Sequence, residues 1–259
     1  MGQFNLSDLV MLQIVGGLDR FNSALLAGED LHPIVEDTRA KATTPHLFPE
    51  IVRKTIETQF ADPATAVREL GQNGRDSYEI DHVPKQIYFS TEESDSGLVL
   101  SVRDYGIGMQ PSEVIRNLLI PYNSGKEFDI TKIGEHGIGW FSVMDLSRRV
   151  EVMTRNGSGA TTYADLKRNC KDWAVSVQLS EENYTGTEVK MHIDRAGFDA
   201  DTVRKHLRKH LGFANSQEVD LRLDGERINI LDNDYRLAGE TAIRNKGLEA
   251  VLGLYMSHS

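Results

Sequence analysis

The order of the predicted elements limits the possible folds of this chain more than any other feature of its sequence. Helical patterns fill the N-terminal part, and short apolar runs with strand-like spacing dominate from residue 85 onwards. Helices followed by strands are typical of an α+β fold rather than of alternating βαβ units. We therefore predict a two-layer α+β sandwich, in which helices cover one face of a mostly antiparallel, mixed sheet.

The N-terminal helical patterns are interrupted twice. One helix is predicted over residues 8–26, with a weak point at Gly16-Gly17. The polar stretch 27–48 contains two prolines and is interpreted as a connection. A second helix begins at Pro49, and a third begins at Pro63, after the N-cap residue Asp62, and runs to about Ile80.

The rest of the chain alternates between strand and turn signals. Helices are predicted after Pro111 and over 140–146, 201–211 and 239–257, and a glycine-rich loop over 121–139. Asn156-Gly157 and Asp224-Gly225 predict hairpin turns. Strands are predicted at 85–90, 98–102, 149–154, 161–166, 174–179 and 187–193.

Charge and cysteine content exclude several classes of protein. The chain of 259 residues has 29 basic and 39 acidic residues, a net charge of −10, which makes nucleic acid an unlikely partner. No apolar run reaches the roughly 18 residues of a membrane span. Cys170 is the single cysteine and cannot form an internal disulfide. The N-terminal residues show no signal-peptide pattern. We therefore expect a cytoplasmic protein that does not insert into membranes.

The first motif that could carry chemistry lies on the third predicted helix. Glu69 and Asn73 are four residues apart, so they share one helix face, and Asp76 follows on the same side. A carboxylate and an amide oxygen one turn apart suit a Mg²⁺ ion that keeps some of its waters, and the carboxylate is free to act as a base. Gly71 and Gly74 disfavour a helix by roughly 1 kcal/mol each, so a ligand or a packed neighbour should approach them. The alternative is a solvated polar face.

Two further glycine-containing motifs follow. In Val102–Met109, Asp104 ends a strand and Gly106 and Gly108 permit close backbone approach, so the carboxylate can accept a hydrogen bond from a buried amino group. The alternative is a capping Asp in a glycine turn. In Ile133–Ser142, three glycines precede an apolar helix and could cradle phosphate, although the segment fits neither a Walker A loop nor a Rossmann unit.

Together, these motifs resemble a known family in their order and spacing. The family is the ATP-binding fold of gyrases, heat-shock chaperones, histidine kinases and mismatch-repair proteins (GHKL, Bergerat fold), and the pattern is closest to the N-terminal domain of heat shock protein 90. The resemblance covers about residues 45–193 and extends towards Leu223. It rests on the strings AVRELGQNGRDS, RDYGIGM, VIRNL, NSGKEF, KIGEHGIGWFSVM, RVEVMTRN and GTEV.

The resemblance implies a role for individual residues. Glu69 would orient or deprotonate the attacking water, and Asn73 would bind the Mg²⁺ that bridges the ATP phosphates. Asp104 would accept a hydrogen bond from the adenine amino group, with Thr187 helping through water. Trp140 stands where the family has a Phe beside the nucleotide. The other nucleotide-binding residues implied are Asp76, Gly108, Met109, Asn117, the lid residues Ser124, Gly125 and Lys126, and the phosphate-cradling Gly134, Gly137, Ile138 and Gly139.

The sequence also departs from the family pattern. The stretch between Met109 and Gly134 is shorter than the chaperone lid, and Asn123 replaces an expected lysine. A middle domain with a catalytic arginine has no room in these 259 residues. We therefore expect either a fragment or a module that a partner completes. The expected organisation is a helical extension (1–44), an ATP-binding domain (45–195) and a helix-hairpin-helix annex or the start of a following domain (196–259).

The predicted function is Mg²⁺-dependent ATP binding with slow hydrolysis, driving a lid-closing switch of the chaperone type. Its partners would be a protein client or partner subunit, with ATP-dependent homodimers as a further possibility. The alternative is an ATP-sensing module that does not hydrolyse and needs a partner protein to complete its site. A histidine kinase is disfavoured, because the sequence shows no phospho-accepting pair of helices before the motifs. A DNA-processing ATPase is disfavoured by the net charge of −10. His206 and His210 lie four apart in a basic segment, which more simply forms a solvated face than a metal site.

Overall fold

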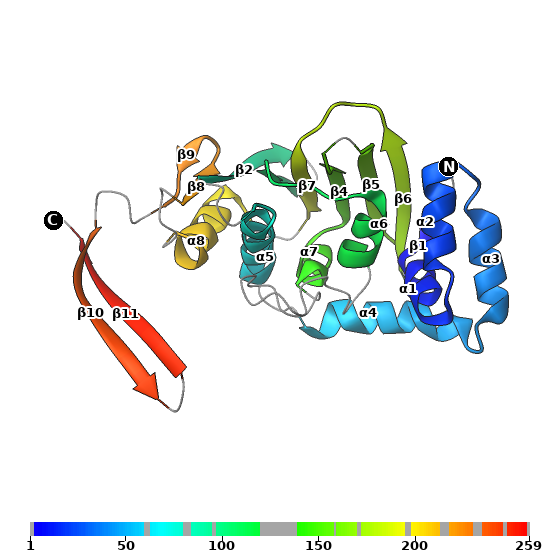
Figure 1. Cartoon of the computed structure of the whole chain (residues 1–259), viewed down its shortest axis with the longest axis horizontal. Coiled ribbons are helices and arrows are strands. Elements are labelled where there is room, and N and C mark those ends of the chain that lie inside the picture. The colour runs from blue at the N-terminus through cyan, green and yellow to red at the C-terminus, as the bar shows by residue number, and fades with distance from the viewer. Residues whose placement is uncertain are drawn as a thin grey trace.

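A single large sheet forms the centre of the computed structural model (Figure 1). It has nine strands in the order β1-β6-β5-β4-β7-β3-β2-β8-β9. Strands β2 and β8 run parallel, and the other neighbouring strands run antiparallel. The predicted α+β fold with a mostly antiparallel sheet is confirmed. The structure describes residues 3–59, 63–79, 84–94, 97–119, 139–157, 159–169, 172–194, 198–212, 218–229, 235–245 and 248–257.

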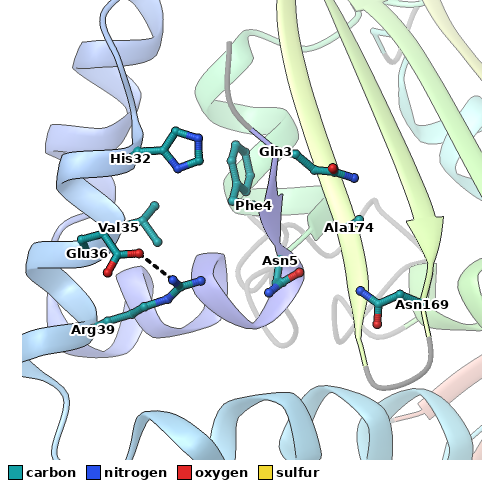
Figure 2. A pocket seen from close by; sticks show the side chains of 9 residues that line it. All are labelled: Gln3, Phe4, Asn5, His32, Val35, Glu36, Arg39, Asn169 and Ala174. Atoms are coloured by element: carbon teal, nitrogen blue, oxygen red, sulfur yellow. Dashed lines mark hydrogen bonds and ion pairs between the residues drawn. The ribbon is translucent and has the colours of Figure 1, made fainter.

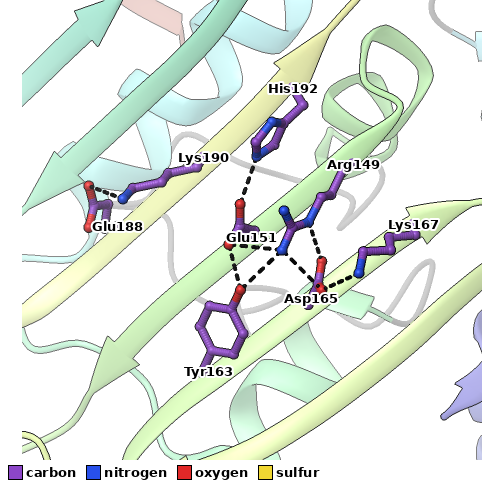
Figure 3. A network of polar contacts seen from close by, with 8 residues as sticks. All are labelled: Arg149, Glu151, Tyr163, Asp165, Lys167, Glu188, Lys190 and His192. Carbon is purple, nitrogen blue, oxygen red and sulfur yellow. Dashed lines mark hydrogen bonds and ion pairs between the residues drawn. The ribbon is translucent and has the colours of Figure 1, made fainter. Parts of the chain in front are cut away.

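The strands follow the predicted alternation of buried and more exposed residues. Val150, Val152, Val189 and Met191 point into the core, where they share one hydrophobic cluster with the helices. The residues between them lie on the opposite face and form the polar network of Figure 3. The strands are β1 (Phe4–Asn5), β2 (Lys85–Ser94), β3 (Gly97–Asp104), β4 (Arg149–Arg155), β5 (Thr161–Arg168), β6 (Trp173–Ser180), β7 (Gly186–Ile193), β8 (Val219–Leu223) and β9 (Glu226–Arg227).

That polar network consists of ion pairs and hydrogen bonds across three neighbouring strands. The Arg149 guanidinium donates to Asp165 Oδ1 at 2.7 Å, and His192 Nε2 lies 2.7 Å from Glu151 Oε1. Charged side chains on this face satisfy one another, whereas the other face carries the apolar core. The sheet therefore has one helix-covered face and one polar face, as a two-layer fold requires.

Helices cover the apolar face, and one of them lies centrally. Helix α5 packs against α7 and α8 and against β2 and β3. Predicted α7 and α8 are confirmed, and the helix after Pro111 continues as a π-helical turn, η2. These helices are α4 (Phe48–Gln59), α5 (Pro63–Asp76), α6 (Pro111–Glu113), η2 (Val114–Leu119), α7 (Trp140–Leu146) and α8 (Ala200–His210). Within the described residues, no helix is both long and apolar enough to cross a membrane.

The N-terminal extension lies beside β6 and contains more helix than predicted (Figure 1). The single helix expected over 8–26 is wrong, because the chain breaks at Gly16-Gly17 into α1 (Leu6–Val15) and α2 (Leu18–Ala27). The connection expected over 27–48 is also wrong, since it contains α3 (His32–Lys41) and the short 3-10 helix η1 (Pro45–Leu47). Pro33 marks a helix start here, a position that proline tolerates.

The C-terminal helix predicted over 239–257 is wrong as well. Strands β10 (Tyr235–Asn245) and β11 (Leu248–Ser257) pair antiparallel and form a separate two-stranded sheet, drawn apart from the large sheet in Figure 1. The apolar residues of 248–256 fit both helical and strand spacing, and periodicity alone cannot separate the two. The hairpin turn predicted at Asp224-Gly225 is confirmed, and both residues have positive φ angles of 52° and 82°.

Candidate functional site

Asp104 occupies a buried position where β3 ends, with only 7% of the residue exposed. Its Oδ1 accepts hydrogen bonds from the Ser77 hydroxyl and the Gly106 amide, both at 2.9 Å. Burial raises the pKa of the Asp104 carboxyl to about 6, although the hydrogen bonds from Gly106 and Ser77 act in the opposite direction. The carboxylate is thus a preorganised acceptor that is still largely ionised at neutral pH.

Two other predicted residues gather around Asp104. The register of β3 and β7 sets Thr187 directly opposite Asp104. The Thr187 hydroxyl lies 2.9 Å from the Thr154 hydroxyl. The Thr154 hydroxyl also accepts a hydrogen bond from the Met109 amide at 2.9 Å. The structure therefore brings Asp104, Thr187 and Met109 together through one buried threonine of β4.

The glycine turn after Asp104 is held tightly by its neighbours. A Cβ on Gly106 would overlap the Ser77 hydroxyl, and a Cβ on Gly108 would overlap the Arg155 carbonyl oxygen. Gly108 also has a φ of 66°, in the left-handed region that favours glycine. The Tyr105 amide donates to the Tyr78 hydroxyl at 2.8 Å. These glycines are needed because strand, turn and helix approach one another closely.

Glu69 lies at the other end of the site. A Cβ on Gly139 would overlap its carboxylate, so the chain just before α7 lies directly against the Glu69 side chain. The Glu69 side chain is 16% exposed, and Arg68 Nη2 lies 3.3 Å from its Oε1. Predicted site residues Glu69, Gly139 and Trp140 are therefore neighbours, on α5 and at the start of α7.

Helix α5 sets the spacing between the two ends. Ser77, which donates to Asp104, follows α5 directly, and its amide donates to the Asn73 carbonyl at 3.0 Å. Asn73 lies one turn before Ser77, and Glu69 one turn before Asn73. At 1.5 Å per residue, Ser77 and Glu69 are separated by about 12 Å along the helix. The site is thus elongated, and half-buried Asn73 lies between its ends.

The remaining predicted residues fall into two groups. Asp76 is the last residue of α5 and is half-buried. Asn117 lies within η2, but its side chain is outside what the structure describes. Six others lie outside the described residues: Ser124, Gly125, Lys126, Gly134, Gly137 and Ile138.

The glycines of α5 have a structural explanation. A Cβ on Gly71 would overlap a methyl group of Leu211, which follows α8, and a Cβ on Gly74 would lie 3.2 Å from Ile87 on β2. Of the two expected explanations for these glycines, a ligand or a packed neighbour, the packed neighbour is the one that the structure shows. Gly71 and Gly74 let α8 and the sheet approach α5 and do not report a ligand.

Sequence reasoning missed three residues that shape the site. Ser77, Tyr78 and Thr154 hold Asp104, the glycine turn and Thr187 in place, as the contacts above show. Ser77 and Thr154 both lie within the sequence motifs of the resemblance, but what their hydroxyls contact is known only from the pairing of the strands. Burial raises the pKa of the Tyr78 hydroxyl to about 12, so it stays protonated in its hydrogen bonds.

One pocket of the structure lies away from the predicted site residues. A pocket of roughly 530 Å³ lies between β1, α3 and β6, where Arg39 and Glu36 line it (Figure 2), and none of the predicted site residues borders it. Among the described residues, no three His, Cys, Asp or Glu side chains form a cluster able to hold a metal ion.

Known proteins resemble this chain over the residues that form the candidate site. The family model of histidine kinase-, DNA gyrase B-, and HSP90-like ATPases matches residues 61–198, more than half of the chain. The mitochondrial TNF receptor-associated protein 1 homolog of Dictyostelium discoideum is 23% identical over 70% of this chain and 29% of its own length. The chaperone protein HtpG of Desulfitobacterium hafniense is 27% identical over 63% and 28%, respectively. The endoplasmin homolog of Arabidopsis thaliana is 28% identical over 45% and 16%. This chain spans less than a third of each relative.

Proposed function

Because the chain belongs to the family of histidine kinase-, DNA gyrase B- and HSP90-like ATPases, we propose that it binds ATP along α5 and hydrolyses it slowly. The observation that carries this proposal is that a buried carboxylate, Asp104, contacts Ser77 at the C-terminal end of α5, while a second carboxylate, Glu69, lies about 12 Å back along that helix from Ser77. An elongated ligand with a hydrogen-bond donor at one end and phosphates at the other fits this arrangement.

The adenine end is assigned to Asp104. A buried carboxylate held by Ser77 and Gly106 accepts the amino hydrogen of adenine without reorganising. Thr187 and Thr154 supply hydroxyls beside it. Gly108 and Met109 form the adjoining wall, and Asn117 is proposed to reach the ribose or a phosphate.

The phosphate end is assigned to Glu69 and Asn73. Glu69 orients the attacking water and accepts its proton, while Arg68 fixes one oxygen of the carboxylate at 3.3 Å. Asn73, one turn along, offers an amide oxygen to Mg²⁺, which would neutralise phosphate charge when bound. Asp76, Gly139 and Trp140 are proposed to border this end. The proposal also includes Ser124, Gly125, Lys126, Gly134, Gly137 and Ile138.

The proposed biological role is an ATP-driven switch that acts on a protein client or partner subunit, with homodimers in the ATP state. Its support is that several relatives are named as chaperones. An ATP-sensing module that does not hydrolyse, and that needs a partner protein to complete its site, is the second candidate. Glu69 favours hydrolysis, because a binding module has no use for a base at that position.

The test combines calorimetric titration of Mg-ATP with phosphate release on the same samples. Wild type should bind and release phosphate, Glu69→Ala should bind but release none, and Asp104→Asn should bind at least about ten-fold more weakly. Binding without any release by wild type would favour the sensor. Normal ATP binding by Asp104→Asn would contradict the site itself.

A further inference from the structure

The indole N–H of Trp140 has no hydrogen-bond acceptor among the described residues, although Trp140 is only 4% exposed. Buried tryptophan N–H groups usually find a partner, because an unsatisfied buried donor is unfavourable by about 1–3 kcal/mol. Such a group calls for an explanation in terms of a ligand or a function.

The position of Trp140 indicates where that partner would come from. Trp140 is the first residue of α7, and the preceding Gly139 lies against the Glu69 carboxylate. Helices α5 and α7 pack together, so Trp140 lies near Glu69, which is about 12 Å back along α5 from the Ser77 contact with Asp104. The missing acceptor is thus expected at the phosphate end.

The chemistry of the ligand supplies that acceptor. Phosphate oxygens only accept hydrogen bonds, and a nearby N–H donor stabilises their charge. A phenylalanine at this position would carry no donor, so Trp140→Phe removes the N–H while keeping an aromatic side chain. We propose that the Trp140 N–H donates a hydrogen bond to a phosphate oxygen of the bound nucleotide, an inference that rests on the proposed function.

The first experiment observes the indole group directly in the full ¹⁵N-labelled chain. The chain has two tryptophans, and Trp140→Phe assigns their two indole N–H signals. Trp173 is the internal control, because it lies on β6 with the Arg168 guanidinium 5.4 Å from its ring centre. Mg-ATP should shift the Trp140 signal downfield and slow its exchange with water, whereas adenosine, which has no phosphate, should do neither and Trp173 should stay unchanged.

The second experiment measures the affinity of Trp140→Phe by calorimetry. The variant should bind Mg-ATP about ten-fold more weakly and adenosine as well as wild type does. An equal loss for both ligands would mean that Trp140 acts by packing, and no loss for either would also overturn the inference.

The two proposals fail in different ways. If wild type bound neither ATP nor adenosine, the proposed function would be wrong, and this inference with it. If wild type bound both ligands while the Trp140 signal did not move with ATP, only the Trp140 inference would be overturned.

Discussion

At the scale of residues, Asp104 is the buried carboxylate of the candidate site. Asp104 receives two hydrogen bonds on Oδ1, and burial raises its pKa to about 6, against a usual value near 3.8. The folded chain therefore holds the Asp104 proton more tightly than the unfolded chain does. It follows that Asp104 destabilises the fold when charged above pH 6, and that this penalty is relieved as the pH falls from about 6 towards 4.

Ligand binding should show the opposite dependence on pH. Protonation replaces a charge-assisted hydrogen bond by a neutral one, so affinity for adenosine should fall several-fold between pH 7.5 and pH 5. Adenosine is the probe because it carries no phosphate that titrates in this range. Calorimetric titrations across this range give the profile, and Asp104→Asn should bind weakly with a flat profile. A wild-type affinity that is constant down to pH 5 would contradict Asp104 as the acceptor.

The candidate site was only partly predictable from the sequence. Glu69, Asn73 and Asp104 stand out because a helical period and a strand end restrict where their side chains lie. Ser77 and Thr154 do not, because a hydroxyl has no sequence signature until the pairing of strands shows what it faces. The orphaned N–H of Trp140 likewise depends on burial, which a sequence does not contain.

At the scale of elements, the turn between β3 and α6 is the most constrained segment of the site. It passes so close to the end of β4 that only a glycine fits at position 108, opposite the Arg155 carbonyl. Gly157 is the second residue after β4 and provides a natural comparison. Its φ of 52° is also in the left-handed region, but no atom lies within 4 Å of the space that a Cβ would occupy.

Alanine substitutions at these two glycines should therefore differ. Gly157→Ala should lower the free energy of unfolding by about 1 kcal/mol through backbone strain alone. Gly108→Ala should lower it by about 1–3 kcal/mol more, because the new methyl group displaces the backbone of β4. Urea denaturation measures both, and equal losses would show that close approach at Gly108 is unimportant. Gly108→Ala should also weaken adenosine binding, since it moves Asp104 and Met109.

The prediction of elements succeeded where the pattern had one interpretation. Alternating residues over 149–154, 161–166 and 187–193 could only form half-buried strands, and they do. The failures occurred where two interpretations were open. Proline at position 33 signals either a loop or a helix start, and residues 239–257 satisfy both helical and strand periods.

At the scale of the whole molecule, the N-terminal extension and the sheet share one core. Buried side chains of α1 to α3 belong to the same hydrophobic cluster as those of the strands, and β1 adds an edge strand beside β6. The division into residues 1–44, 45–195 and 196–259 stays a prediction. Asp8 joins the parts of the extension, since its Oδ2 accepts from the Asn5 amide at 2.9 Å and from Arg39 at 2.8 Å.

Removal of Arg39 should therefore loosen the extension as a whole. Its guanidinium makes two hydrogen bonds to Asp8, whose side chain is 5% exposed, and a further one to Glu36, drawn in Figure 2. In Arg39→Ala the Asp8 charge remains buried without its cation, which should lower the free energy of unfolding by about 2 kcal/mol or more.

The matched control is Arg20→Ala, because Arg20 forms an ion pair with Asp37 at 3.4 Å whose side chains are 65% and 44% exposed. Such a surface pair is screened by solvent and salt, so its loss should be barely measurable in the same urea denaturation. If the two variants lost equal stability, Asp8 would not hold the parts of the extension together. Arg39→Ala should bind adenosine with the same affinity as wild type, because Arg39 lines a pocket that none of the proposed nucleotide-binding residues borders.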